Sequence, residues 1–571
     1  MYLAELGYRN IRFMANIKNL LRYAEENSRF LFAFFFVLVL LDRLNTFLRF
    51  SVVYTDSDQL VMWQIAKDLM NGSFHGPCFY GQSYNPVFEP LFALPLLFSG
   101  MDLHTALPLV TTLLGVAPFL ILSFYLCKKS GPLTGLLPLL LSLLLPPGYS
   151  MLTSFSRGFV TGIFFAVTGF VLLVFHRSFF SRLSGGILWG VGVYANPNCV
   201  LLLPLIIPFL PYERKELFRT MVPWITGFCL GMSSLVFNAA YYHSHPEMLI
   251  HGSPSLKMSF DSFVLVLSRL DNYFTYITPV VWHWGWVSLL LFILTGIRLW
   301  RYKRKMEFLS LALLFAAILL SFSVAKVTHG TNSVFFSGSR MFLAYPFILL
   351  FLFIFYLNTL PVPRRKNVIF TAVLLSVVAF TVKVMAFDLF LKNALKGTRN
   401  SIVKVIPVDT LRTTCEEMLS FANGHADLVV ANSSDTPDQP ITYGCPCLIL
   451  DFPVTIQPLY ERRTWILPEI LDRVYERVLI HGKDTNAWKR MNIEGLQVIR
   501  SDVQKGWMLI ENRLRTRDLL HETGIKTIDG TSGNINSIQG RNESIICHHY
   551  SRRIDCLRHR RIVPVPEAAG K

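Results

Sequence analysis

Long apolar runs recur between Phe30 and Phe387 and constrain the fold more than any other feature of this chain. Several reach the roughly 18–20 residues that a helix needs to cross about 30 Å of hydrocarbon. Because a bilayer core holds no water to satisfy backbone polar groups, such segments cross it as helices. Only 16% of the 571 residues are charged and 52% are hydrophobic, whereas soluble domains carry about 25% charged residues. The sequence therefore predicts a mainly α, polytopic membrane protein.

The number of apolar runs predicts about eleven spans. Short clusters of Lys and Arg lie between alternate runs, and the positive-inside rule places those connections in the cytoplasm. The odd count then puts the first loop, 49–104, and the chain after the last span on the extracytoplasmic side. The expected spans are roughly 30–48, 105–127, 131–148, 158–176, a pair within 184–211, 222–242, 280–299, 306–325, 338–357 and 367–387.

In the segment 184–211 the length and the charge pattern disagree. Basic clusters on both sides require an even number of crossings, yet the segment has too few residues for two full ones. Pro197 lacks a backbone donor and breaks the helix. We therefore expect two short helices that meet near Asn196, either spanning or re-entrant.

The net charge of +17 would suggest a nucleic-acid partner in a soluble protein. Here the basic residues lie mainly in short connections and in the last part of the chain, so no nucleic acid is expected. Hydropathy falls sharply after Asp388, which marks a second part. We expect a basic cytoplasmic segment at 1–29 without a cleavable signal peptide, a transmembrane domain at 30–387, a small extracytoplasmic α/β domain at 388–527, and a basic, disordered tail at 528–571.

The second part alternates helical and strand-like patterns, which is typical of a small α/β domain. If this part lies outside the cytoplasm a disulfide is permitted among its cysteines, but the sequence does not reveal the pairing. Helices are expected at 409–423 and 467–479, and strands at 427–431, 447–451 and 507–511.

Two acids, Asp56 and Asp58, stand just beyond the first span. Carboxylates beside the membrane are costly unless they are solvated or functional. They could act as a general base or hold a cation. They could also form a solvated turn that caps the following helix, as an Asp before a helix often does. Both interpretations stay open on the sequence.

Several motifs follow one another in a fixed order: Asp58, the helix end from Ala66 to Gly72, Tyr80-Gly81-Gln82-Ser83-Tyr84, Glu89, the Gly186-x-x-x-Gly190 helix that runs to Asn196-Pro197, and Arg340 with Tyr345-Pro346 behind it. This set resembles the GT-C superfamily, and most closely the bacterial relatives of protein O-mannosyltransferases and the aminoarabinose transferase. The resemblance covers roughly residues 30–390. The family usually has Asp-Glu where this chain has Asp58-Gln59, which leaves open how Asp56 and Asp58 divide the work.

The resemblance implies a GT-C-like fold and a reaction. A hexosyl or pentosyl group would pass from a polyprenyl-phosphate donor to a hydroxyl, with inversion at the anomeric carbon. Such chemistry needs a carboxylate base, cations for the departing phosphate, and a groove open to the bilayer. We assign Asp58 as the base, with Asp56 as second choice. The candidate substrate-binding residues are Arg340, Lys326, His329 and Arg157 for phosphate, Tyr80, Gln82 and Tyr84 for the sugar, and Glu89 and Asn196 nearby.

Plainer roles compete for several of these residues. Arg340 could be an interfacial anchor whose long side chain reaches the membrane surface. Tyr80 and Tyr84 could belong to an aromatic belt at the same level. We expect no bound cofactor, while metal dependence stays open.

The expected partners are the lipid-linked sugar donor, a lipid, glycan or protein acceptor, and membrane lipids. The expected location is the bacterial inner membrane, with the site facing outside. The alternative function is a lipid or solute transporter or flippase of the cell envelope. Transporters tend to contain internal repeats and ionisable groups inside their spans. The sequence shows no repeat and spans nearly free of charge.

Overall fold

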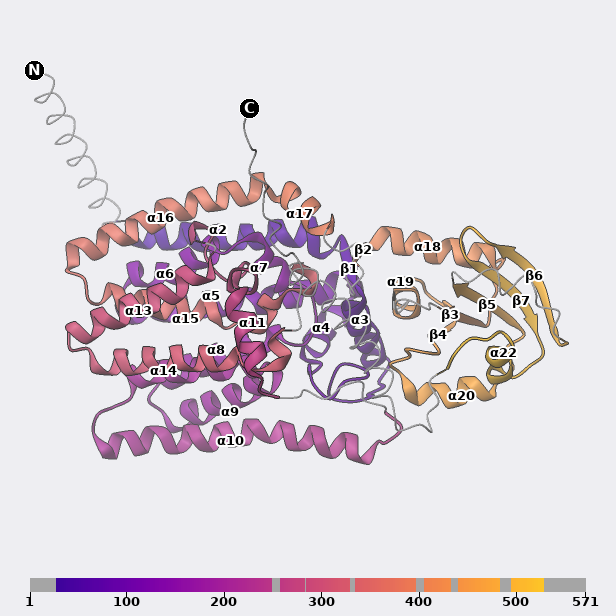
Figure 1. Cartoon of the computed structure of the whole chain (residues 1–571), viewed down its shortest axis with the longest axis horizontal. Coiled ribbons are helices and arrows are strands. Elements are labelled where there is room, and N and C mark those ends of the chain that lie inside the picture. Colours follow the sequence, from indigo (N-terminus) through magenta and orange to yellow (C-terminus); the bar gives the residue numbers. More distant parts are fainter. Residues whose placement is uncertain are drawn as a thin grey trace, which may run out of the picture.

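The computed structural model shows an elongated molecule with a bundle of helices at one end and an α/β unit at the other (Figure 1). It describes residues 27–248, 257–282, 284–328, 334–396, 405–432, 440–482 and 494–527. His329, most of the N-terminal segment 1–29 and the whole tail 528–571 lie outside the described residues.

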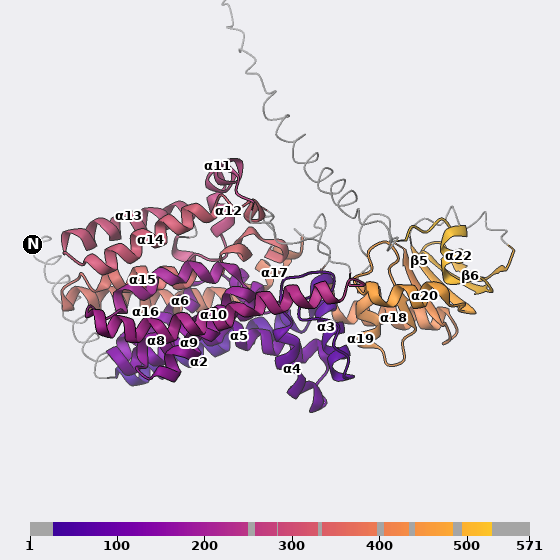
Figure 2. The same ribbon diagram turned by 90° about the horizontal axis from the view of Figure 1, so that it is seen from below.

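Apolar helices build the first part of the chain, as predicted, and lie side by side along the long axis of the molecule (Figure 2). Each expected span overlaps one of them. On length and composition, and among the described residues, four helical segments are long and apolar enough to cross a membrane: α2 with the turn after it, α5, α10 and α16. The number of crossings stays a prediction. The helices are α2 (Ser28–Thr46), α5 (Leu103–Ser130), α6 (Pro132–Leu144), α8 (Val160–Phe175), α9 (Phe179–Ala195), the 3₁₀-helix η2 (Pro197–Phe209), α10 (Arg214–Ser244), α13 (Gly285–Arg301), α14 (Lys305–Ser321), α15 (Tyr345–Leu357) and α16 (Val362–Met385).

The geometry of η2 explains the short segment 184–211. Helix α9 has 17 residues and η2 has 13, with a break at Asn196 between them. A 3₁₀-helix rises about 2.0 Å per residue against 1.5 Å for an α-helix, so each of the two extends roughly 25 Å. A run of 3₁₀ this long is uncommon. The 3₁₀ geometry lets the 13 residues of η2 extend about as far as the 17 residues of α9.

Glycines let α9 pack against helices on two sides. A methyl group on Gly190 would stand 2.5 Å from the carbonyl oxygen of Phe228 in α10. One on Gly192 would stand 2.8 Å from the carbonyl oxygen of Gly162 in α8. Such small-residue faces allow close backbone approach where lipid supplies no hydrophobic driving force. The Gly186-x-x-x-Gly190 motif is therefore a packing surface for α10.

A salt bridge joins α2 to α16, although the sequence led us to expect spans nearly free of charge. The Lys383 ammonium donates to Asp42 at 2.8 Å, and both side chains are buried. Arg43, the residue after Asp42, is also buried and donates to the hydroxyl of Thr153 at 2.9 Å. Asp42, Arg43 and Lys383 are exceptions within the expected spans. The sequence could not show that Asp42 and Lys383 pair, because they are more than 300 residues apart.

The same contacts show that α2 and α16 run parallel. Beyond the Asp42–Lys383 pair, Arg49 of the π-helical turn η1 (Phe47–Ser51) donates to the carbonyl of Val384 at 3.1 Å. Both helices therefore end on the same side of the bundle. The ion pair is neutral as a unit and fixes the first helix to the last, which is a structural role.

The C-terminal unit contains a five-stranded sheet in the order β4-β3-β5-β7-β6. Strands β4, β3 and β5 are parallel, whereas β7 pairs antiparallel with β5 and β6. Helices α18, α20 and α22 accompany the sheet (Figure 1). The elements are α18 (Val408–Phe421), β3 (Leu428–Asn432), α19 (Cys445–Leu448), β4 (Val454–Ile456), α20 (Leu467–Asp472), β5 (Arg477–Gly482), β6 (Leu496–Asp502), β7 (Trp507–Asn512) and α22 (Thr516–Glu522).

Two predictions of secondary structure fail in this unit. The strand expected at 447–451 is a helical turn followed by a bend, because Pro446 favours a helix start and Asp451 adopts a positive φ of 55°. The helix expected at 467–479 ends at Asp472, and strand β5 follows. Short apolar runs do not by themselves distinguish a helix from a strand.

The first loop and the C-terminal unit form one packed body. Strand β1 (Tyr54–Asp56) pairs antiparallel with β2 (Val405–Pro407), and the Val408 N–H donates to the Val53 carbonyl at 2.8 Å. Helix α3 (Ser57–Met70) shares a hydrophobic core with α18 and the sheet. A disulfide, Cys415–Cys445, joins α18 to α19 beside that core. The C-terminal unit therefore lies on the same side of the helices as the first loop.

Candidate active site

The acidic pair lies where β1 turns into α3, and the structure gives its two members different surroundings. Asp56 is completely buried and is the N-cap of α3, accepting from the Gln59 N–H at 2.8 Å. Its other oxygen forms an ion pair with Arg157. The capping interpretation thus describes Asp56, whose carboxylate already has two partners.

Arg157 connects the cap of α3 to two other segments. It lies in the loop between α7 (Pro147–Leu152) and α8, and its side chain is only 5% exposed. Besides Asp56, its guanidinium donates to the carbonyl of Phe335 at 2.6 Å. These two contacts hold the start of α3 and the segment at Phe335 together. Because the Asp56 carboxylate balances its charge, Arg157 adds little net charge to the site.

Asp58, two residues further along, is half-buried and lies close enough to Arg340 and Tyr84 for their charges to interact. Arg340 comes from the 3₁₀ turn η6 (Gly338–Phe342), which leads into α15. Lys326, from η4 (Ala325–Thr328), places its ammonium 3.8 Å from the centre of the Tyr84 ring. Asp58, Tyr84, Lys326 and Arg340 therefore converge, and we call these four residues the Asp58–Arg340 cluster.

Electrostatics in this cluster favour an anionic ligand. Burial lowers the pKa of Lys326 to about 8, and the neighbouring Arg340 guanidinium adds to the shift. Burial likewise raises the pKa of the Tyr84 hydroxyl, so this phenol stays neutral. Two cations then face one carboxylate, which leaves a net positive charge where a phosphate would be stabilised.

Hydrogen bonds from neighbouring elements fix the backbone of the segments that carry the cluster residues. The Tyr84 loop is fixed by Asn238 of α10, whose amide donates to the carbonyl of Ser83 at 2.7 Å. The Arg340 turn is fixed by Ser339, whose hydroxyl donates to the Tyr273 carbonyl at 2.6 Å. Such support keeps charged side chains aimed at one point without a ligand.

One further cation, Arg462, comes from the C-terminal unit and escaped the sequence analysis. Its guanidinium lies 5.2 Å from the centre of the Phe79 ring, and its charge acts on Tyr84. The buried Glu461 anchors this segment by accepting from the Tyr443 hydroxyl at 2.8 Å and from the Arg463 side chain at 2.9 Å. No local motif marks Arg462, because only the packing of the two parts brings it to the first loop.

Two of the proposed sugar-binding residues make contacts of their own. The Tyr80 hydroxyl donates to Asp68 at 2.7 Å, and its ring packs edge-on against Trp465 at 4.8 Å. Gln82 accepts from the side chain of Asn85 at 3.1 Å. The structure therefore brings Tyr84 into the cluster, while Tyr80 and Gln82 brace the loop that carries it.

Glu89 and Asn196 lie next to the loop that carries Arg157. Glu89 opens α4 (Phe88–Phe98), a helix that the sequence analysis did not predict, and is completely buried near Gly158 and Thr161. Burial raises the pKa of Glu89 to about 7. Asn196 caps η2 by accepting from the Asn198 N–H at 3.1 Å, and it donates to the Phe159 carbonyl at 3.1 Å. Asn196 therefore supports the loop that carries Arg157, and Glu89 lies buried next to that loop.

The described residues contain no group of three or more His, Cys, Asp or Glu side chains that could hold a metal ion. The cluster instead combines one half-buried carboxylate, two cations and an aromatic ring. A carboxylate beside fixed cations can accept a proton while the cations stabilise charge that develops on a departing phosphate.

Comparison with known proteins finds similarity in structure only. No family model and no curated protein sequence matches this chain. The crystal structure of ArnT from Cupriavidus metallidurans in the apo state matches 84% of this chain and 98% of its own, with 12% sequence identity and a TM-score of 0.52. ArnT from the same organism bound to undecaprenyl phosphate matches 85% of this chain and 99% of its own, with 11% identity and a TM-score of 0.49. ArnT is the aminoarabinose transferase, a GT-C glycosyltransferase, and the first similarity confirms the predicted GT-C-like fold.

Proposed function

We propose that this protein is a membrane glycosyltransferase that moves a sugar from a polyprenyl-phosphate donor to a hydroxyl acceptor. The observation that carries the proposal is the convergence of Asp58, Tyr84, Lys326 and Arg340. These residues come from two stretches that are far apart in the chain, 58–84 and 326–340. The similarity of the fold to ArnT supports the proposal. In this chain the four residues lie on the first loop and on the turns between α14 and α15.

Asp58 is the proposed general base. It is half-buried and so accessible to an acceptor, whereas the buried Asp56 already accepts from Gln59 and pairs with Arg157. In the proposed step the acceptor oxygen attacks the anomeric carbon, and the bond from that carbon to the phosphate oxygen breaks. The acceptor proton passes to Asp58, and the bonding electron pair leaves with the lipid phosphate. A single displacement of this kind inverts the anomeric carbon.

Arg340 and Lys326 are the proposed phosphate ligands. The leaving phosphate gains one negative charge as the bond to the sugar breaks, so fixed cations act more strongly on the transition state than on the donor. The planar guanidinium of Arg340 can hold two phosphate oxygens at once, while the Lys326 ammonium acts as a point charge. Arg462 is a third cation on the rim, contributed by the C-terminal unit.

We place the reaction outside the cytoplasm, at the inner membrane of a bacterium. The Cys415–Cys445 disulfide lies in the part that packs on the first loop, and disulfides persist mainly in oxidising compartments. The basic turn between α13 and α14 lies at the opposite end of the bundle, away from the C-terminal unit (Figure 1). The positive-inside rule assigns such a turn to the cytoplasm.

A transfer assay tests the proposal. The purified protein would be incubated with a panel of polyprenyl-phosphate sugars and envelope acceptors, and sugar transfer would be measured by mass spectrometry. We expect transfer from at least one donor. We expect none of that activity in Arg340→Ala and weaker donor binding in Arg340→Lys, which keeps the charge but loses the planar fork.

Arg517→Lys is the matched control, because Arg517 pairs with Asp472 on the exposed surface of the C-terminal unit. It should transfer sugar as the wild type does. Unchanged donor affinity and turnover in Arg340→Ala would refute the phosphate-binding role.

A further inference from the structure

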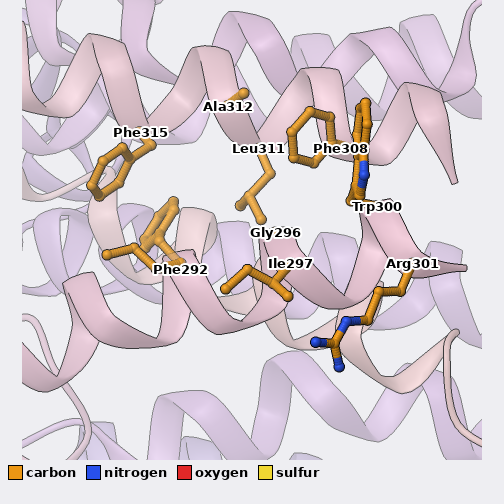
Figure 3. Close-up of a pocket in the computed structure, with 10 residues that line it drawn as sticks. Phe292, Gly296, Ile297, Trp300, Arg301, Phe308, Leu311, Ala312 and Phe315 are labelled. Carbon is orange, nitrogen blue, oxygen red and sulfur yellow. The ribbon is translucent and has the colours of Figure 1, made fainter. Parts of the chain in front are cut away.

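A groove between α13 and α14 lies outside the candidate active site. It has a volume of about 410 Å³ and is lined almost entirely by apolar side chains (Figure 3). Phe292 and Phe315 meet at one end with ring centres 5.9 Å apart. Trp300 and Phe308 meet at the other end at 5.2 Å.

Gly296 lines the groove and leaves space in it. A methyl group placed on Gly296 would find its nearest neighbours, in Leu311 and Phe308, at 3.9 Å. The glycines of α9, in contrast, are pressed against backbone atoms of the neighbouring helices. Space at Gly296 is therefore left open where a larger residue would fill it.

The length of the groove matches one leaflet of a bilayer. Phe292 and Trp300 are eight positions apart on α13, which corresponds to about 12 Å of helix. Half of a hydrocarbon core is about 15 Å. One acyl chain that enters from the α13–α14 turn would fill the groove to its far end.

Charge at the mouth of the groove selects the headgroup. Arg301 lines the groove at the Trp300 end and is exposed. The neighbouring arginines are engaged elsewhere: Arg298 donates to the Thr359 hydroxyl at 2.5 Å, and Arg304 donates to Glu307 at 2.8 Å. Lys303 and Lys305 of the same turn are also exposed, but Arg301 is the one charged side chain among the residues that line the groove.

We propose that this groove binds an anionic phospholipid of the leaflet next to the α13–α14 turn, with one acyl chain between the helices and the phosphate at Arg301. Lipid tails gain little from leaving other lipid tails, so the preference must come from shape and charge. One arginine near the surface changes the affinity for an anionic headgroup about fivefold. The proposal does not depend on the catalytic assignment.

Photocrosslinking tests the proposal on the full-length protein. Phosphatidylglycerol and phosphatidylcholine, each with a diazirine on one acyl chain, would be added at equal mole fraction. Adducts on peptides from α13 and α14 would then be counted by mass spectrometry. We expect about fivefold more adduct from phosphatidylglycerol in the wild type.

Two substitutions test the acyl-chain site and the headgroup site separately. Gly296→Leu fills the groove with a good helix former and should abolish the adducts of both lipids, while Arg301→Gln should keep the adducts and lose the preference. Lys303→Gln, a charge change in the same turn outside the groove lining, should lower the preference less than Arg301→Gln does, because Lys303 does not line the groove. Equal labelling by both lipids in the wild type would overturn the proposal, as would undiminished labelling in Gly296→Leu. Suppression by undecaprenyl phosphate as strong as that by unlabelled phosphatidylglycerol would also overturn it.

Discussion

Lys326 gives the site a dependence on pH. Burial and Arg340 lower its pKa to about 8, so the ammonium is charged below that pH and neutral above it. A phosphate monoester with a second pKa near 6 is already a dianion at pH 7.5. Between pH 7.5 and 9.5 the phosphate keeps its charge while Lys326 loses its own, and loss of that charge weakens phosphate binding.

We therefore expect the affinity of the wild type for undecaprenyl phosphate to fall across pH 7.5 to 9.5. Lys326→Gln should bind more weakly at pH 7.5 and show little change over the same range. Isothermal titration in detergent at several pH values would measure both. A wild-type affinity that is flat with pH, or a variant with the same slope as the wild type, would remove Lys326 from the phosphate site.

Among individual residues, the sequence pointed to the members of the Asp58–Arg340 cluster better than to residues whose role depends on packing between distant segments. Asp58 lies just beyond the first apolar helix, and Lys326 and Arg340 lie in the turns between α14 and α15. Hydropathy locates the ends of these apolar helices, so it pointed to all three residues. The sequence could not separate Asp56 from Asp58, because the ion pair with Arg157 depends on a loop about 100 residues away. Arg462 depends on the docking of the C-terminal unit and left no local signal.

Among the elements, α9 depends most on small residues. A methyl group on Gly190 would stand 2.5 Å from the Phe228 carbonyl oxygen, whereas one on Gly296 would meet nothing closer than 3.9 Å. Both glycines lie inside helices, so Gly→Ala gains similar helix propensity at each. We expect Gly190→Ala to be destabilised by about 1–3 kcal/mol through overpacking.

Thermal unfolding in detergent would compare Gly190→Ala with Gly296→Ala as its matched control. The control should unfold at or slightly above the wild-type temperature. Equal behaviour of the two variants would mean that α9 and α10 are not in close backbone contact.

Hydropathy located most helices but did not predict the geometry of η2 or the presence of α4. Apolar runs located the helices, and the break at Pro197 was foreseen. The 3₁₀ geometry of η2 was not, because hydropathy measures apolar length in residues and not rise per residue. Helix α4 was missed because its 11 residues are too few to cross a bilayer and it lies inside a loop.

For the whole molecule, the structure joins the first loop to the C-terminal unit through β1 and β2. We expect both to face outside and the α13–α14 turn to face the cytoplasm. A membrane-impermeant maleimide on intact cells should label Ser99→Cys and Glu469→Cys, which are exposed positions. It should label Lys303→Cys only after the cells are permeabilised. Labelling of Lys303→Cys alone in intact cells would invert the topology and place the site in the cytoplasm.

The measurement that tests the central claim most directly is single-turnover transfer by Asp58→Asn and Asp56→Asn beside the wild type, each at saturating donor. Asn at position 58 keeps the shape but cannot take the proton, so the rate should fall about 10²–10⁴-fold while the unfolding temperature stays unchanged. Asn at position 56 still caps α3 but unpairs Arg157, so it should mainly lose stability. A near-wild-type rate in Asp58→Asn would contradict the account.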